Sequence, residues 1–459
     1  MLFSSITFIY YFLPMLLLVY FLVPRNYKNI VLLIFSLVFY FLGEPKYILI
    51  LLLSCGINYF LGIKISDGKN KKLFLVMGVI YNISQLLVFK YTDFFINNVN
   101  NLFGTNIPFT YIVMPIGISF FTFQALGYVI DIYREKHKSA RTLADFITYV
   151  SLFPQLIAGP IVRYSDIKRE LVQRDVSFDK FSEGIRRFII GLSKKVLIAN
   201  VLGEVIGELI SINVLSSWMK AIFFTLQIYF DFSGYSDMAI GLGLMFGFRF
   251  LENFNYPLIS SSITEFWRRW HISLSSWFRD YVYIPLGGNR VSVFKWFRNI
   301  FIVWFLTGFW HGSSWKFIIW GLYFGIILVI EKFFLKKYLD KTKVLKYIYT
   351  SLIVIIGFLI FNSENISDII VSLKNMFLIR DIPFYNHETL YFFKSNLVLI
   401  IISIIGATPL GKVLVDKVRK SKFNRLIDVL EVIYLMVLFL LCTAFLIDAS
   451  FNPFLYFRF

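Results

Sequence analysis

The sequence has little of several features on which soluble enzymes depend. Only 16% of its 459 residues are charged, and it contains just four histidines and two cysteines. Cys55 and Cys442 lie far apart within apolar stretches, so they predict buried thiols and neither a disulfide framework nor a metal site. The chain has no Gly-x-Ser-x-Gly elbow and no His-Glu-x-x-His pair, and its turn 285–290 has no Walker-type spacing. The serine-hydrolase and zinc-protease templates are therefore excluded, and nothing indicates ATP hydrolysis.

Apolar residues make up 58% of the chain, and many form runs close to the roughly 20 residues with which a helix spans a bilayer. Runs such as LPMLLLVYFLV do not alternate apolar and polar side chains, which excludes a closed β-barrel. We therefore predict an all-α polytopic membrane protein with about ten to twelve transmembrane helices. Because no repeat, low-complexity tract or soluble domain interrupts the pattern, we assign residues 1–459 to a single membrane-embedded domain.

Basic residues outnumber acidic ones, 46 to 28, and most lie in short loops between apolar runs. Such loops stay on the cytoplasmic side of a membrane and attract anionic lipids. The 91–110 loop holds no Lys or Arg, and no charged side chain precedes Arg25, so we place that loop and the N-terminus outside the cytoplasm. In a soluble protein the net charge of +18 would indicate nucleic-acid binding. Its distribution here favours membrane lipids as partners and no nucleic acid.

Residues 146–162 break the alternation of inside and outside loops. The segment is apolar but short, contains Pro154 and Pro160, and has basic loops on both sides. We interpret it as re-entrant rather than spanning. Irregular backbone at that depth requires a cover of protein or a water-filled cavity. We therefore expect a central cavity, open towards the cytoplasm, that this segment partly lines.

The stretch 265–316 concentrates the residues that suit chemistry, with two of the four histidines and seven of the nine tryptophans. We predict one helix over 266–281, because its aromatic residues recur at i, i+3 and i+4 while its arginines fall on the opposite face. Such a helix would lie at the cytoplasmic interface, with His271 at the edge of the aromatic face. Partial burial would keep this imidazole neutral and usable as a base. On spacing alone, however, we favour an anchoring histidine that hydrogen-bonds a backbone carbonyl.

His311 is the stronger candidate for chemistry. It lies in the segment 299–315, which contains no Asp, Glu, Lys or Arg, and an ionisable group in such a segment is by default a functional candidate. Gly312 and the two serines that follow permit a break in the helix, which would free backbone groups to bind a ligand. A dry, neutral imidazole suits proton abstraction from a hydroxyl or thiol. The alternative is a packed histidine that hydrogen-bonds a serine.

Other polar residues allow two interpretations each. Asp231 and Asp237 lie in an apolar segment rich in glycine and serine, which predicts either close helix packing or a broken helix. Each acid either pairs with a neighbour or, at least for Asp231, faces the cavity. The arginines of 268–290 either contact lipid headgroups or hold the phosphates of an anionic donor. The turn 285–290, PLGGNR, would bring backbone amides close to such phosphates.

Five blocks of sequence resemble the membrane-bound O-acyltransferase family, and most closely its alginate and peptidoglycan O-acetyltransferase branch. They are SFFTFQALGYVIDIYR (119–134), SLFPQLIAGPIVRYSD (151–166), QIYFDFSGYSDMAIGLGLMFGFRFLENFNYPL (227–258), EFWRRWHISLSSWFRDYVYIPLGGNR (265–290) and TGFWHG (307–312). The resemblance implies a ring of transmembrane helices with re-entrant segments around a central funnel. It also implies that His311 and His271 are the family's two site histidines.

The activity that this resemblance implies is transfer of an acyl group, acetyl in our prediction, from a cytoplasmic thioester such as acetyl-CoA to an extracytoplasmic polysaccharide. It implies a multi-pass protein of the bacterial plasma membrane, no tightly bound cofactor, and a separate extracytoplasmic SGNH-type protein as partner. We place six further residues at the donor site or funnel lining: Trp310, Asp231, Arg268, Arg279, Asp280 and Asn289. The alternatives are D-alanyl transfer to teichoic acid and transport of a lipid-linked sugar, although the absence of an internal repeat disfavours a transporter.

Overall fold

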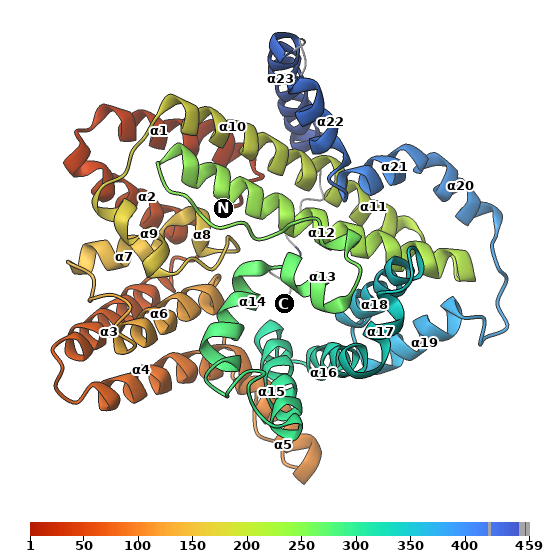
Figure 1. The fold of residues 1–459 in the computed structure, drawn as a ribbon, viewed down its shortest axis with the longest axis horizontal. Coiled ribbons are helices and arrows are strands. Elements are labelled where there is room, and N and C mark those ends of the chain that lie inside the picture. Colours follow the sequence, from red (N-terminus) through yellow and green to blue (C-terminus); the bar gives the residue numbers. More distant parts are fainter. Residues whose placement is uncertain (421–423, 449–454, 456–459) are drawn as a thin grey trace. The chain divides into compact units, whose positions relative to one another are not determined.

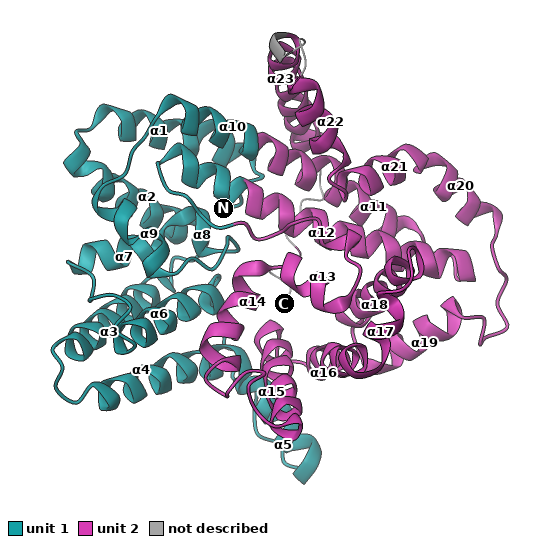
Figure 2. Ribbon diagram, in the orientation of Figure 1, with its two compact units in different colours: residues 1–188, 238–251 teal, residues 189–237, 252–459 magenta. Residues whose placement is uncertain are grey.

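The structure, a computed structural model, describes residues 1–420, 424–448 and 455. These residues form helices and connecting loops with no strand, which confirms the all-α prediction (Figure 1). The chain divides into two compact units (Figure 2). Unit 1 comprises Met1–Phe188 and Met238–Leu251, and unit 2 comprises Ile189–Asp237 and Glu252–Phe459. The assignment of the whole chain to one domain stays a prediction.

Unit 1 is built from short helices joined by tight loops. Its α-helices are α1 (Leu13–Leu22), α2 (Lys28–Gly43), α3 (Ile48–Ser66), α4 (Lys71–Leu86), α5 (Thr92–Phe103), α6 (Ile118–Tyr133), α7 (Leu143–Ser151), α8 (Phe153–Leu156) and α9 (Tyr164–Val172). Single turns of other helix types are η1 (Phe8–Phe12), η2 (Arg25–Tyr27) and η3 (Leu87–Tyr91).

Unit 2 contains the longer helices and the two site histidines. Its α-helices are α11 (Val201–Glu208), α13 (Ile263–Arg269), α14 (Ile272–Phe278), α15 (Val293–His311), α16 (Trp315–Ile330), α17 (Lys336–Leu339), α18 (Leu345–Asn362), α19 (Ile366–Met376), α20 (His387–Ser395), α21 (Leu397–Gly406), α22 (Leu410–Arg419) and α23 (Asn424–Asp448). Its single turns of other types are η4 (Lys194–Asn200), η5 (Pro257–Ile259), η6 (Arg279–Tyr283) and η7 (Glu331–Leu335).

Two helices, α10 (Phe178–Ser193) and α12 (Val214–Met245), each carry the chain from one unit to the other. Glycines let these helices pack closely. A Cβ on either Gly184 or Gly241 would lie 2.6 Å from the backbone oxygen of the other, and a Cβ on Gly234 would lie 2.7 Å from the oxygen of Gly191. No side chain fits at such separations. The close packing predicted for this Gly-rich segment is therefore confirmed.

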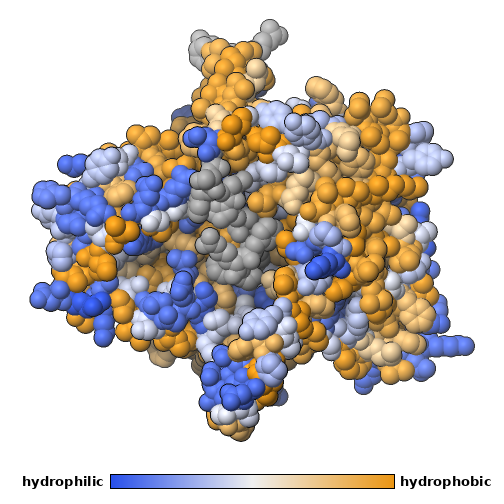
Figure 3. All heavy atoms as spheres, turned by 180° about the vertical axis from the view of Figure 1, so that it is seen from behind, coloured by the Kyte–Doolittle hydropathy of each residue, from blue (hydrophilic) through white to orange (hydrophobic). Residues whose placement is uncertain are grey.

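Six helical segments are long and apolar enough to cross a membrane: Arg25–Gly43, Ile48–Ser66, Lys71–Phe103, Trp315–Leu339, Leu345–Asn362 and Leu426–Asp448. A seventh arises if α20 and α21, bent by 54°, form one broken span. The apolar side chains exposed along α23 stand out in Figure 3, as expected for a surface that faces lipid. The chain is thus a multi-pass membrane protein. The larger count of ten to twelve spans, the ring and the funnel stay predictions.

The segment predicted to be re-entrant is broken and buried within unit 1. Helix α7 ends at Ser151, α8 adds one short turn, and residues 157–163 follow without regular structure. The hydroxyl of Tyr149 donates to the backbone oxygen of Val162 at 3.0 Å, and the backbone N–H of Phe153 donates to Ser36 Oγ at 3.2 Å. Protein therefore covers the irregular backbone, as a re-entrant segment would require, and the re-entrant position itself stays a prediction.

The core of unit 2 consists largely of aromatic rings. Trp304, Trp320, Phe324, Phe358 and Phe361 are all buried in one hydrophobic cluster, which also takes in Tyr229 and Phe230 of α12. The rings of Trp304 and Trp320 lie 6.3 Å apart, and those of Trp320 and Phe324 lie 5.4 Å apart at steep angles. Because edge-to-face contacts fix ring orientation as well as burying area, this core holds its neighbours rigidly.

Candidate active site

The segment around His271 is not the single helix predicted over 266–281. Helix α13 ends at Arg269, α14 begins at Ile272, and His271 between them has a φ of +45°. The loop 253–255 causes this break, because the N–H of Ile272 donates to the oxygen of Asn253 and the N–H of Asn255 donates to the oxygen of Arg269, both at 2.9 Å. Tertiary pairing has overridden the helical period.

The aromatic face itself was predicted correctly. Its buried members are Phe266, Trp270, Leu274, Trp277, Phe278 and Tyr281. Residues spaced three or four apart share one side of a helix. This holds within each of two short helices just as it does within one long helix. The periodicity therefore predicts burial more securely than it predicts helix length.

Asn253 fixes the position of the proton on the His271 ring. Its Oδ1 atom accepts the backbone N–H of Ser273 at 3.2 Å and the Ser273 hydroxyl at 2.9 Å, while its Nδ2 atom donates to Ser236 Oγ at 3.0 Å. Because that oxygen can only accept, the His271 Nδ1 atom 3.1 Å away must carry a hydrogen and donate it. The neutral ring then has its lone pair on Nε2, the atom that would take up a proton. His271 is anchored, as predicted, but by a side-chain amide instead of a backbone carbonyl.

Burial keeps this imidazole neutral. His271 is 1% exposed, and the edge of the Phe232 ring lies against it with the centroids 4.7 Å apart. His271 lies outside the candidate membrane spans. Removal from solvent lowers the pKa of its imidazole to about 3, because the charged form loses its hydration.

His311 is positioned by a different means, at the end of a long helix. It is the last residue of α15, Gly312 follows in an extended conformation, and α16 begins at Trp315, so the predicted break is confirmed. The Trp320 and Phe361 rings meet the imidazole edge-on, with centroids 4.9 and 5.3 Å away. His311 is 8% exposed and its orientation is set by packing between aromatic rings.

Two glycines allow α16 to return closely along α15. A Cβ on Gly308 would collide with the backbone oxygen of Phe317, and a Cβ on Gly321 would collide with that of Trp304. The close approach brings Trp320 to His311 from the second helix. The segment Thr307–Trp315 thus combines a glycine contact, a helix end and a buried histidine within nine residues.

Trp310 joins the two histidines into one site. Its indole centroid lies 5.0 Å from the His311 ring and 6.2 Å from the His271 ring. The tryptophan is 6% exposed, so both imidazoles border the same buried ring. The structure therefore brings together three of the residues that the sequence singled out.

Asp231 forms a buried ion pair in unit 2. Its carboxylate lies 2.6 Å from the Lys195 ammonium, both side chains are at most 3% exposed, and its second oxygen accepts the backbone N–H of Leu455 at 2.9 Å. Asp237 pairs with Lys194 at 2.7 Å in the same way but closer to the surface. Pairing with a neighbour is therefore the interpretation that the geometry favours for both acids. A role for Asp231 at the funnel stays a prediction.

The remaining predicted residues lie towards the surface of unit 2. Arg268 and Asn289 are exposed, and Arg279 is a partner of Asp280 in a two-bond pair of 2.7 and 3.3 Å. The side chain of Arg279 is 61% exposed, so this pair contributes little to stability. A donor-binding role for these four residues stays a prediction.

The turn 285–290 does not offer its amides to a phosphate. The N–H groups of Leu286, Gly287, Gly288 and Arg290 all donate to backbone oxygens within 282–287. Asn299 of α15 fixes the turn from the other side, donating to the oxygens of Leu286 and Gly288 at 3.1 and 3.0 Å. The prediction of an amide cradle is therefore wrong for these four groups.

Sequence reasoning missed Asn253, Glu331 and Trp320. The carboxylate of Glu331, 1% exposed, accepts the backbone N–H groups of Ile263 and Thr264 at 2.6 and 3.1 Å and so caps α13. An acid at the end of a long apolar run was a usable signal for it. The indole N–H of Trp320 is buried and finds no acceptor among the described residues. Nothing in its local sequence distinguishes that tryptophan.

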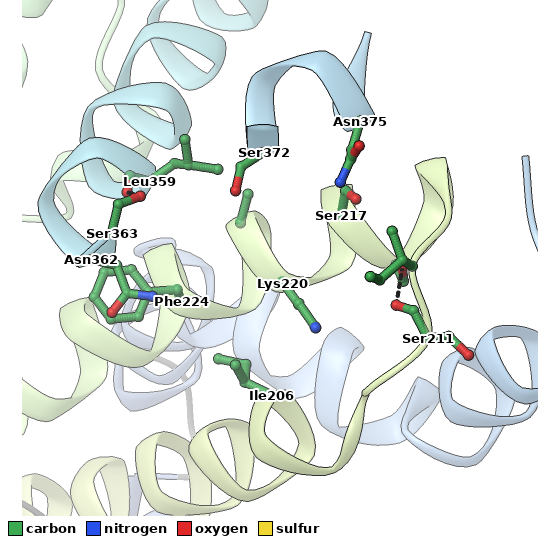
Figure 4. Close-up of a pocket in the computed structure, with 13 residues that line it drawn as sticks. Ile206, Ser211, Ser217, Lys220, Phe224, Leu359, Asn362, Ser363, Ser372 and Asn375 are labelled. Carbon is green, nitrogen blue, oxygen red and sulfur yellow. Dashed lines mark hydrogen bonds between the residues drawn. The ribbon is translucent and has the colours of Figure 1, made fainter. Parts of the chain in front are cut away.

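A pocket of about 200 Å³ lies in unit 2 between α11, α12, α18 and α19 (Figure 4). Serine hydroxyls, two asparagine amides and one lysine line it together with five apolar side chains, and Lys220 extends from α12 into the pocket. Leu359 and Asn362 of its wall precede and follow Phe361, the residue whose ring meets His311. The pocket therefore shares one turn of α18 with the histidine site.

Comparison with known proteins connects this geometry to a family. The sequence profile of the membrane-bound O-acyltransferase family (MBOAT) matches residues 111–366, which include both histidines. The chain is 44% identical over 379 residues to the probable alginate O-acetylase of Azotobacter vinelandii, which covers 80% of this chain and 76% of that protein.

Two further relatives carry different names. The peptidoglycan O-acetyltransferase of Helicobacter pylori is 36% identical over 419 residues, covering 82% of this chain and 80% of that protein. The teichoic acid D-alanyltransferase of Bacillus subtilis is 31% identical over 273 residues, covering 54% of this chain and 69% of that protein. All three names describe acyl transfer to a polymer.

Proposed function

Because this chain belongs to the membrane-bound O-acyltransferase family and is an acyltransferase, we propose that it carries acetyl groups from a cytoplasmic thioester to an extracytoplasmic polysaccharide or cell-wall polymer. The observation that carries the proposal is the pair of buried histidines on one tryptophan, within the residues that the family profile matches. Acetyl is the group named for the relatives with the higher identity.

His311 is the proposed base. In the proposed reaction it takes the proton from an attacking hydroxyl as the new C–O bond forms, the thioester C–S bond breaks, and the proton passes to the leaving thiolate. The hydroxyl belongs to the acceptor or to an SGNH-type partner protein that completes the transfer. The indole N–H of Trp320, beside the His311 ring, is suited to donate to the carbonyl oxygen as negative charge develops there.

His271 is the second histidine of the proposed site. Its Nδ1 hydrogen is committed to Asn253, so proton transfer at this ring would use Nε2. Its low pKa supports a neutral imidazole at the pH of the cytoplasm. No metal ion or tightly bound cofactor is part of the proposal, and acetyl-CoA is a substrate.

The polar side chains of the pocket between α11, α12, α18 and α19 support an acceptor made of sugars. Their hydroxyl and amide groups match the hydrogen-bonding groups of a polysaccharide, and the Lys220 ammonium matches a carboxylate on a uronic acid. We propose that an acceptor or the partner's side chain approaches His311 past this pocket. The N-terminus outside the cytoplasm and a bacterial plasma membrane complete the proposed arrangement.

The experiment is acetyl transfer by membranes that contain the chain. Inside-out vesicles from cells expressing the chain and its partner receive radiolabelled acetyl-CoA, and label bound covalently to polymer within the vesicles is counted. The matched pair His311→Ala and His387→Ala makes the same change at a buried site residue and at an exposed histidine. We expect label in the polymer for wild type and His387→Ala, and none for His311→Ala.

Other results would replace the proposal. Label from a D-alanyl thioester but not from acetyl-CoA would assign D-alanyl transfer, for which the Bacillus subtilis relative is the precedent. Passage of polymer precursor across the membrane without covalent label would assign transport. Undiminished acetyl transfer by a stably inserted His311→Ala protein would remove the proposed base.

A further inference from the structure

A second cavity, in unit 1, is lined mainly by basic side chains. Its volume is about 450 Å³. Five cationic side chains line it, Arg25, Arg169, Arg174, Lys180 and Arg249, against two carboxylates, Glu170 and Asp175. Arg25 lies in η2, Arg169 in α9 and Lys180 in α10, while Arg174 and Arg249 lie in the loops that follow α9 and α12. Folding therefore gathers these cations from separate segments.

Arg174 is held in place by protein on several sides. Its Nε atom donates to the Tyr20 hydroxyl at 2.9 Å, its Nη1 atom donates to Asn29 Oδ1, and its guanidinium stacks over the Phe248 ring at 4.8 Å. Tyr20 is fully buried and donates in turn to the oxygen of Phe246 at 2.9 Å. A side chain fixed by this many contacts is a built element and not a mobile surface charge.

One end of this arginine has no acceptor. Its Nη2 atom is buried and makes no hydrogen bond with the described residues. Gly247, with a φ of +87°, lies in the same lining, and a Cβ there would sit 3.3 Å from Arg174 Cδ and 3.0 Å from Val176. The glycine thus leaves room for the arginine beside the cavity. A buried charged donor without an acceptor is expensive.

The other cations carry an excess of positive charge. Lys180 pairs with Asp175 at 3.7 Å, whereas Arg25, Arg169 and Arg249 form no ion pair with a carboxylate of the described residues. Positive loops alone require basic residues on one side of the membrane, not their convergence on one cavity. Like charges brought together repel, so an anionic ligand would stabilise the arrangement.

The place of the cavity indicates the kind of anion. Arg25 begins the apolar segment Arg25–Gly43, so it marks one end of a candidate span, the depth at which phospholipid phosphates lie. Phe21, Leu22 and Tyr27 beside it are 47%, 74% and 57% exposed, as side chains that meet lipid would be. Arginine forks match the oxygens of a phosphate.

We propose that this cavity binds a phosphate-bearing group, with the phosphodiester headgroup of a membrane phospholipid as its source. The carboxylates of Glu170 and Asp175 in the lining are matched in charge to the ammonium of an ethanolamine headgroup. This site is separate from the proposed acyl-transfer chemistry and does not depend on it.

The test measures lipid retained by the full-length protein in neutral detergent. Delipidated protein receives phosphatidylglycerol, phosphatidylethanolamine or inorganic pyrophosphate, and native mass spectrometry counts the adducts. The cavity variant replaces Arg25, Arg169 and Arg249 with glutamine. The control variant replaces Lys69, Lys72 and Lys138 with glutamine, so both variants lose three positive charges. These three lysines are exposed residues of unit 1 outside the cavity lining.

We expect wild type and the control variant to retain phospholipid equally, and the cavity variant to lose affinity by roughly tenfold or more. Unfolding temperatures of all three proteins verify that the cavity variant is folded. If pyrophosphate displaces the lipid, or binds when lipid does not, the cavity is a phosphate-binding site whose ligand is a soluble phosphate compound. Equal retention by the cavity and control variants, or no phosphate ligand on the wild type, overturns the proposal.

Discussion

His271 and His311 border the same tryptophan, yet different kinds of interaction position them. His271 lies in a left-handed turn between two short helices, and one amide oxygen accepts its Nδ1 hydrogen. His311 ends a nineteen-residue helix, and the rings of Trp310, Trp320 and Phe361 surround it. The first imidazole has a chemically assigned tautomer, while the orientation of the second follows from the shape of an aromatic core.

This difference suits two roles. A ring whose tautomer is fixed presents the same nitrogen at all times, so it can hold a substrate in one orientation. A ring held by packing at a helix end lies beside an extended Gly312 and a close helix contact, where backbone and ligand can approach. We therefore expect His311 to transfer the proton and His271 to position the substrate. Substitutions that remove each ring, or its support, separately can test this division.

The largest expected effect is on turnover in a His311→Gln protein. Loss of a general base lowers kcat by about 100- to 10,000-fold, whereas loss of a positioning ring in His271→Gln lowers it by about 100-fold or less. Acetyl transfer to polymer under saturating acetyl-CoA measures both. Glutamine preserves much of the volume, so a large cavity is not created in either protein.

The matched control is His387→Gln, because His387 is exposed on α20 and lies outside the site. Its kcat should equal that of wild type. Equal losses at positions 311 and 271, in proteins with unchanged unfolding temperatures, would contradict the division of roles.

The next largest effect is on the free energy of unfolding, in a variant that removes the amide to which His271 is hydrogen-bonded. In Asn253→Leu, three donors lose their acceptor at once: His271 Nδ1, the Ser273 N–H and the Ser273 hydroxyl. Each buried unsatisfied donor costs about 1–3 kcal/mol, so the free energy of unfolding should fall by about 3 kcal/mol or more. Denaturation in detergent measures this change.

Asn365→Leu serves as the comparison, because Asn365 is exposed and accepts a single backbone N–H, that of Asp368, at the start of α19. Loss of such a cap costs about 1 kcal/mol. A cost for Asn253→Leu no greater than that of the cap would mean that the amide does not hold the ring.

The same contrast explains what the sequence could predict. The break after His311 was visible because Gly312 and two serines follow an uncharged apolar run, and such signals are local. The close packing of α10 and α12 was visible for the same reason, in the glycines of 234–243. The aromatic face of 266–281 was predicted correctly in burial, since its period survives division into two helices.

What could not be predicted depends on partners distant in sequence. His271 is set by Asn253, eighteen residues earlier, and α13 is capped by Glu331, more than sixty residues later. The ion pair of Asp231 likewise depends on Lys195, thirty-six residues earlier in the chain. The amide cradle expected at 285–290 was wrong for the N–H groups of 286, 287, 288 and 290, because neighbouring carbonyls already accept them, which residue types alone do not reveal.

The smallest expected effect is a pH dependence of stability that belongs to His271 alone. Its pKa is about 3 in the folded protein and near 6.5 when unfolded, so between these values the unfolded state binds more protons. Stability from this group is present in full above pH 6.5 and is lost as pH falls towards 3. From pH 7.5 to 5.0 the loss is roughly 2 kcal/mol.

Unfolding temperatures measured in detergent from pH 7.5 to 5.0 check this contribution by difference. His271→Gln should fall less steeply than wild type with acidification, because no proton is then gained on unfolding at position 271. His387→Gln is the matched control for the substitution, because His387 is exposed on α20 and lies outside the site. Identical slopes for His271→Gln and wild type would mean that the His271 ring is hydrated in the folded protein. That result would also contradict the fixed Nδ1 donor that distinguishes His271 from His311.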